Sequence, residues 1–145
     1  MSRRLARELA LRILYWFEQG NGDIKQIIKK VLEIKKYSQA DKNFTKKLVE
    51  MTINNLPQID REIIKVLKNW KYGRVSVIDK LLLRLGTCEI VYFNDIPYQV
   101  AINEAIEIGK KYGNTESSKF INGILDAIAT ASRSKKGIYE SSNNK

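Results

Sequence analysis

Apolar residues recur along this chain at a spacing that is typical of helices. Between residues 3 and 19 an apolar side chain recurs every four positions, at Leu5, Leu9, Ile13 and Phe17. This repeat places an apolar stripe on a helix, and Ala6, Ala10 and Trp16 widen the stripe. Gly20 and Gly22 follow, and because glycine readily takes a left-handed backbone, they predict the end of this helix.

The same spacing continues after residue 22 and predicts six more helices. They span residues 23–36, 41–54, 59–70, 76–93, 98–111 and 115–131. Asp23 is the expected N-cap of the first of these, and Ser76 followed by Asp79 resembles a capping box. Pro57 interrupts the pattern, whereas Pro97 stands at a first helical position, where proline is tolerated. Because no segment shows the alternation of a strand, the predicted fold class is all-α with about seven helices.

The segment Lys71–Arg74 is the best candidate for a hinge between two halves of the chain. A chain of 145 residues can build one ordinary domain with its own core but not two. We therefore predict a single helical domain over residues 1–131, with packed subdomains over about 1–72 and 73–131. Residues 132–145 are basic and carry few apolar side chains, so we predict a disordered tail there.

The composition disfavours catalysis and metal binding. The chain has no histidine and one cysteine, Cys88, so it lacks the ligands of compact zinc sites and the usual histidine-based nucleophile pairs. No glycine-rich phosphate loop occurs, and we expect no cofactor. Carboxylates, tyrosines and lysines could still do chemistry, so these absences disfavour an enzyme without disproving one.

Charged residues interrupt every apolar stretch of the chain. None of these stretches approaches the ~20 residues of a membrane span. The first residues are basic, but Arg7, Glu8 and Arg12 break up the apolar segment that a secretion signal needs. We therefore expect a cytoplasmic protein with no membrane association.

Basic residues clearly outnumber acidic ones. The 26 lysines and arginines against 16 aspartates and glutamates give a formal net charge of +10. Such a charge attracts polyanions, and nucleic acid is the abundant polyanion of the cytoplasm. The alternative is that lysine only keeps a helical protein soluble. The location of the charges has to separate these two interpretations.

Arginine is concentrated at the start of the first predicted helix. Four arginines occur within ten residues there, whereas the other basic residues are mostly lysine: Arg3, Arg4, Arg7 and Arg12. At ~100° per residue, the first three lie within about 100° of one another and away from Leu5 and Leu9, so we expect them to face solvent. Guanidinium groups pair with phosphates and stack on bases, which favours nucleic-acid contact. The alternative is a solvated helix face.

Two aromatic residues follow the arginines on the same helix. Exposed aromatic rings beside arginines can stack on unpaired bases. Trp16 lies beside Ile13 and Phe17 and is therefore predicted to be part of the core. Tyr15 is the better candidate for base contact.

Several small or polar residues stand inside strongly apolar helices. Gly86 and Gly123 cost helix stability relative to alanine, which predicts close helix–helix approach at both positions. The polar residues are Glu89, Asn103, Glu104 and Asn122. We interpret them as groups that cap or cross-link neighbouring helices rather than as an active site.

Three groups of residues occur in an order and spacing that one known family shares. The first group is Arg3–Glu8 with Leu14-Tyr15, and the second is Asn69-Trp70, Asp79-Lys80, Leu83–Leu85 and Glu89-Ile90. The third and strongest is Ile96–Glu107, followed by Lys110–Gly113 and Ser118–Asp126. Together these segments run from residue 3 to about 128 and resemble the NusB family of bacterial transcription antitermination factors. Each is weakly specific alone, whereas the set is highly specific.

This resemblance implies an all-helical protein of two packed subdomains that is not an enzyme. It implies binding of boxA, a single-stranded RNA element in ribosomal RNA leaders, jointly with the ribosomal protein NusE. It also implies that the resulting complex modifies RNA polymerase so that the polymerase reads through terminators. A homodimer is a further possibility, because an apolar partner surface could be covered by NusE, by a second copy or by neither.

The resemblance also implies roles for individual residues. Arg3, Arg4, Arg7 and Tyr15 would contact RNA, and Lys119 with Phe120 would form a second RNA contact. Asp79 occupies a position that the family uses toward NusE, and we expect it in the solvent-reachable first turn of its helix. Glu116 stands where the family has an acidic residue that tunes this interaction, so Asp79 and Glu116 are the residues expected to bind the protein partner.

Two positions depart from the family pattern. Arg12 stands where a polar uncharged residue is common, and it would add a phosphate contact. Cys88 replaces an aromatic residue before Glu89, which indicates a change of packing.

Two other interpretations compete with an antitermination factor. One is the helical domain of a ribosomal RNA cytosine methyltransferase, but that enzyme needs a cofactor-binding domain and a catalytic cysteine, for which 145 residues leave no room. The other is a protein-interaction module whose charge is only solubilising.

Overall fold

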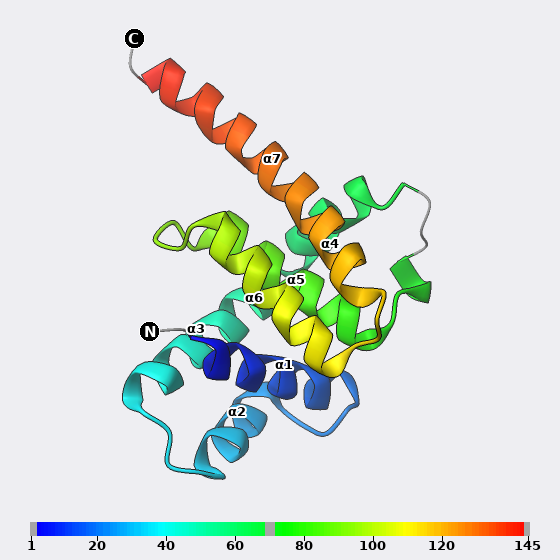
Figure 1. Cartoon of the computed structure of the whole chain (residues 1–145). Coiled ribbons are helices and arrows are strands. Elements are labelled where there is room, and N and C mark those ends of the chain that lie inside the picture. Colours follow the sequence, from blue (N-terminus) through cyan, green and yellow to red (C-terminus); the bar gives the residue numbers. More distant parts are fainter. Residues whose placement is uncertain (1–2, 69–71, 144–145) are drawn as a thin grey trace.

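The computed structural model describes residues 3–68 and 72–143, with side chains described through residue 132. Within those ranges the chain forms seven α-helices and one short 3-10 helix. They are α1 (Arg4–Glu18), α2 (Ile24–Glu33), α3 (Gln39–Asn54), α4 (Leu56–Val66), η1 (Tyr72–Arg74), α5 (Val77–Tyr92), α6 (Tyr98–Tyr112) and α7 (Ser117–Asn143). The predicted all-α fold class with about seven helices is confirmed (Figure 1).

Several helix boundaries follow from single residues, as the sequence indicates. The Asp79 N–H donates to Ser76 Oγ at 3.2 Å, so the predicted capping interaction begins α5. Asp23 holds the N-cap position of α2, although its side chain makes no capping hydrogen bond. Gly20 and Gly22 have φ values of 77° and 123°, the left-handed backbone predicted for the end of α1.

Helix α4 differs from its prediction at both ends. It begins at Leu56 instead of Ile59, because Pro57 lies in its first turn, where a missing backbone N–H removes no helical hydrogen bond. It ends at Val66, and the last predicted residues, 69 and 70, lie outside the described residues.

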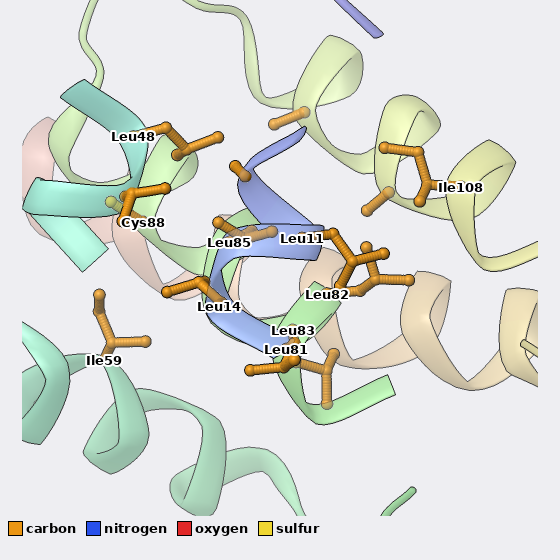
Figure 2. Packing of buried hydrophobic residues seen from close by; sticks show 14 of the residues in the cluster. Leu11, Leu14, Leu48, Ile59, Leu81, Leu82, Leu83, Leu85, Cys88 and Ile108 are labelled. Atoms are coloured by element: carbon orange, nitrogen blue, oxygen red, sulfur yellow. The ribbon is translucent and has the colours of Figure 1, made fainter. Parts of the chain in front are cut away.

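Helix α5 lies at the centre of the fold. It packs against α1, α3, α4, α6 and α7, and ten of its residues are buried. Figure 2 shows Leu81, Leu82 and Leu85 of this helix among side chains from α1, α3, α4 and α6. Cys88 is fully buried in the same core, and burial raises the pKa of its thiol to about 11, consistent with a packing role.

The first four helices and the last three share this apolar core. Residues of α1, α3 and α4 contact α5, and α4 also contacts α7. The predicted division at about residue 72 stays a prediction, and part of the proposed hinge, residues 69–71, lies outside the described residues.

Only one of the two glycines predicted at close helix contacts has that role. A Cβ at Gly86 would lie 2.6 Å from Leu125 Cδ1, so a larger residue there would force the buried Leu125 side chain of α7 to shift. A Cβ at Gly123 would meet nothing within 4 Å, so the prediction for that position is wrong.

The chain continues as a helix where a disordered tail was predicted. Helix α7 runs to Asn143, twelve residues past the predicted end at Ala131, and extends away from the bundle (Figure 1). Between residues 132 and 143 the sequence has no proline, and its one glycine, Gly137, lowers helix stability without ending the helix. Low apolar content therefore does not predict where this helix ends. None of the described helices is long and apolar enough to cross a membrane.

The buried face of α1 is rotated from the predicted stripe. Leu9 and Ile13 are buried, whereas Leu5, Trp16 and Phe17 are exposed, so Trp16 is not a core residue. The buried face centres near Ala10 and Leu14, roughly 80° further round at ~100° per residue. It is wide because α1 packs on α2 and α3 as well as on α5 and α6.

Candidate nucleic-acid interface

Arg7 lies inside the protein and not on its surface. Only 4% of this residue is exposed, and its Nε and Nη2 donate to the Glu89 carboxylate at 2.6–3.0 Å. The rotated buried face of α1 explains this position, since it includes Arg7 between Ala10 and Leu11. The prediction that Arg7 faces solvent is therefore wrong, and the residue cannot reach RNA without rearrangement.

A second carboxylate joins the same cluster from α6. Glu104 Oε2 accepts from Arg4 Nε at 2.7 Å, and its Oε1 lies 4.0 Å from Arg7 Nη1. The hydrogen bond from Arg4 to Glu104 raises the pKa of Arg4, and burial raises the pKa of Glu89 although Arg7 opposes this. These two carboxylates link α5 and α6 to the start of α1, as predicted for polar residues in apolar helices. Asn103 and Asn122, expected in the same role, are exposed.

The remaining arginines of α1 are available at the surface. Arg3 and Arg4 are exposed, and the Arg3 guanidinium lies 4.6 Å from the centre of the Phe44 ring. Arg12 is exposed on the same helix face as Arg4 and Tyr15, since spacings of eight and three residues bring side chains to one side of a helix. The structure thus brings three of the four predicted arginines to the surface.

Tyr15 borders a shallow hollow between α1, α5 and the end of α6. The hollow has a volume of about 240 Å³, and Arg12, Ile78 and Tyr112 also line it. Tyr15 and Tyr112 are 39% and 43% exposed, which leaves both rings accessible to a planar partner. The role of Tyr112 could not be predicted from the sequence, because its position beside Tyr15 depends on how α6 packs against α1.

The other four predicted site residues meet at one larger hollow. It has a volume of about 470 Å³ and is lined by Arg74, Val75, Ser76, Asp79, Asn114, Glu116, Lys119 and Phe120. Glu116 and Lys119 are exposed and Phe120 is half-buried. The residues predicted to bind the protein partner and those predicted as a second RNA contact therefore line the same hollow. Arg74 and Asn114 were missed because both lie outside the long helices.

Asp79 is less accessible than predicted. It is 7% exposed, because α5 is covered by neighbours on most sides even in its first turn. Its Oδ1 is buried and has no hydrogen-bond partner among the described residues. A buried carboxylate oxygen without a donor is costly, so it is a preferred position for an incoming donor or cation.

An ion-paired cluster fixes the short helix η1 near this hollow. Arg84 donates through Nε and Nη2 to the Asp60 carboxylate at 2.9 and 3.0 Å, and the Tyr72 hydroxyl donates to Asp60 Oδ1 at 2.7 Å. Burial raises the pKa of Tyr72 far above its ordinary value. The cluster ties α4, η1 and α5 together and so helps to position Arg74. Over the described part of the chain, no three metal-ligating side chains gather into a candidate metal site.

The fold and these surfaces define a basic, all-α protein with two surface hollows that are lined by charged and aromatic side chains. Residues 4–130 match the sequence model of the NusB family. The chain therefore belongs to the NusB family, and it is a transcription antitermination factor.

Curated relatives that match this chain over most of their length are transcription antitermination proteins. A transcription antitermination protein NusB of Chloroherpeton thalassium is 39% identical over 142 residues, covering 97% of this chain and 67% of the relative. Another from Pelotomaculum thermopropionicum is 43% identical over 132 residues, covering 88% of this chain and 89% of the relative.

Solved structures have the same fold. T. maritima NusB superposes with a TM-score of 0.82 at 37% identity, covering 90% of this chain and 92% of that one. A crystal structure of antitermination factors NusB and NusE in complex with dsRNA gives a TM-score of 0.82 at 27% identity, covering 90% and 97%.

Proposed function

We propose that this chain binds the boxA element of ribosomal RNA leaders together with ribosomal protein NusE. The resulting complex would help RNA polymerase to read through terminators. The observation that carries the RNA-binding part is the exposed set Arg3, Arg4, Arg12 and Tyr15, which concentrates phosphate-binding and base-stacking groups on one helix. A related NusB that has been crystallised with NusE and dsRNA supports the choice of partners.

The two hollows have different roles in this proposal: one binds RNA, and the other binds both RNA and NusE. Arg4, Arg12 and Tyr15 contact RNA at the α1 face, and Lys119 with Phe120 forms the second RNA contact at the larger hollow. Asp79 and Glu116 take part in NusE binding there, because a donor or cation from the partner would satisfy the unpaired Asp79 oxygen. Arg7 acts indirectly by holding the start of α1.

Arg4→Ala is expected to make the binding of a boxA RNA less dependent on salt. Each neutralised phosphate releases a counterion, so losing one contact reduces the slope of log affinity against log salt by about 1. The measurement is a fluorescence-anisotropy titration at several salt concentrations. Lys29→Ala, at an exposed lysine on α2, is the control that removes the same charge elsewhere. An unchanged slope for Arg4→Ala would contradict RNA contact by this arginine.

RNA affinity is expected to rise at least tenfold when NusE is present. Two ligands that share a continuous surface are coupled, and tenfold corresponds to about 1.4 kcal/mol. Titration of boxA RNA into the chain alone and into its complex with NusE measures this coupling. Asp79→Asn should reduce NusE affinity while leaving RNA affinity in the absence of NusE unchanged. Equal RNA affinities with and without NusE would show that the two ligands bind independently.

A further inference from the structure

A second cationic surface adjoins the arginine-rich start of α1. The rings of Phe44 on α3 and Phe93 at the end of α5 pack edge to face, with centres 5.8 Å apart. Arg3 lies 4.6 Å from the Phe44 centre, and Lys47 lies 4.7 Å from the Phe93 centre. Both rings are buried, so this pair of rings acts as a platform that holds one exposed cation against each ring.

The outer face of α3 continues from Lys47 along a shallow hollow. This hollow has a volume of about 340 Å³ and is lined by Asn43, Lys46, Lys47, Glu50, Met51 and Asn54. Lys46 and Lys47 are exposed, and among the described residues neither lysine forms an ion pair. Asn43 and Asn54 add side-chain amides, which can donate to phosphates and accept from bases.

We propose that the nucleotides flanking the RNA bound at α1 run across this platform and bind along α3. Lys46 and Lys47 would contact the phosphates of this flanking single strand, and the two asparagines would contact its bases or sugars. Continuity favours RNA as the occupant, since Arg3 and Lys47 contact the two rings of one packed pair. This inference rests on the proposed RNA-binding function and extends the interface beyond the residues assigned to it.

Substitution of Glu50 provides a second test, in which RNA affinity should change in the opposite direction to that of the lysine variants. Its carboxylate is exposed in the same hollow as the two lysines and would repel a phosphate there. Removing this charge should therefore strengthen the contact that removing the lysines weakens. A structural effect of substitution on α3 would not produce opposite signs at neighbouring exposed positions.

The test compares two RNAs, the boxA element alone and the same element extended by an unstructured strand of about ten nucleotides on each side. The variants are Lys46→Ala/Lys47→Ala, Glu50→Gln and the charge-matched control Lys29→Ala/Lys30→Ala on α2. For the extended RNA, the α3 lysine variant should reduce the salt slope by about 2 and lower affinity. Glu50→Gln should raise affinity for that RNA, and all variants should bind the short RNA like the unchanged protein.

Three other outcomes would overturn either this proposal or the proposed function. Equal losses from the α3 and α2 lysine pairs would show a general charge effect and overturn the proposal. A loss that is the same for both RNAs would place the lysines at the boxA contact itself and overturn the flanking path. Failure of the unchanged protein to bind either RNA, with or without NusE, would overturn the proposed function. Circular dichroism at matched concentration confirms that each variant is folded.

Discussion

Arg7→Ala is expected to lower the free energy of unfolding by about 3–5 kcal/mol, the usual cost of removing one partner from a buried ion pair. Glu89 is 2% exposed and accepts three hydrogen bonds of 2.6–3.0 Å from Arg7, so the substitution would leave a carboxylate buried without its main donor. Glu104, at 4.0 Å from Arg7, would lose a second interaction. Urea denaturation followed by circular dichroism measures the change.

A double substitution separates the effect of the unpaired charge from the effect of lost side-chain packing. Arg7→Met/Glu89→Leu replaces the pair with apolar side chains of similar length, and such replacements are often neutral or stabilising. We therefore expect it to recover most of the stability lost in Arg7→Ala. If the double variant is as unstable as Arg7→Ala, side-chain packing and not the unpaired charge accounts for the loss. A cost below about 1 kcal/mol for Arg7→Ala would contradict a strong buried pair.

The same double variant tests how Arg7 contributes to RNA binding. If Arg7 only holds the start of α1 in place, the folded double variant keeps Arg3 and Arg4 at the surface and retains RNA affinity. Direct RNA contact by Arg7 would instead require loss of affinity in a stable protein. Its burial beneath the surface favours the first result.

Helix periodicity predicts nearly all of the helices, because it depends on local spacing. The capping pair Ser76 and Asp79 and the left-handed Gly20 and Gly22 are equally local, and the structure has them as predicted. The orientation of α1 could not be predicted in the same way. Which side of a helix is buried depends on how many neighbours cover it, and α1 is covered from two directions.

The exposure of the candidate site residues also depends on packing that the sequence does not reveal. The sequence indicates that arginines gather at the start of α1, but it cannot distinguish the buried Arg7 from the exposed Arg4, since a Glu89 partner 82 positions away decides between them. Asp79 is similar, because its burial results from the packing around α5. Tyr15 is exposed as predicted, since it lies opposite the buried face of α1.

Tyr15→Ala is expected to weaken boxA RNA binding by about 1–3 kcal/mol, which corresponds to roughly 5–150-fold in affinity. The ring is exposed at the hollow between α1 and α6, with Arg12 beside it, so one base can stack on it while a neighbouring phosphate pairs with the guanidinium. Removing the ring removes the stacking surface and leaves the helix intact, since alanine favours a helix. Anisotropy titration at fixed salt measures the loss.

Two variants decide whether stacking is the cause. Tyr15→Phe keeps the ring and loses only the hydroxyl, so its RNA affinity should remain close to that of the unchanged protein. Trp16→Ala removes another exposed aromatic residue of α1, about 100° away from Tyr15 and outside the hollow, and should leave RNA binding unchanged. An equal loss in Tyr15→Ala and Trp16→Ala would contradict a specific stacking site. A loss in Tyr15→Phe would assign the contact to the hydroxyl, because the stacking surface is the same in both side chains.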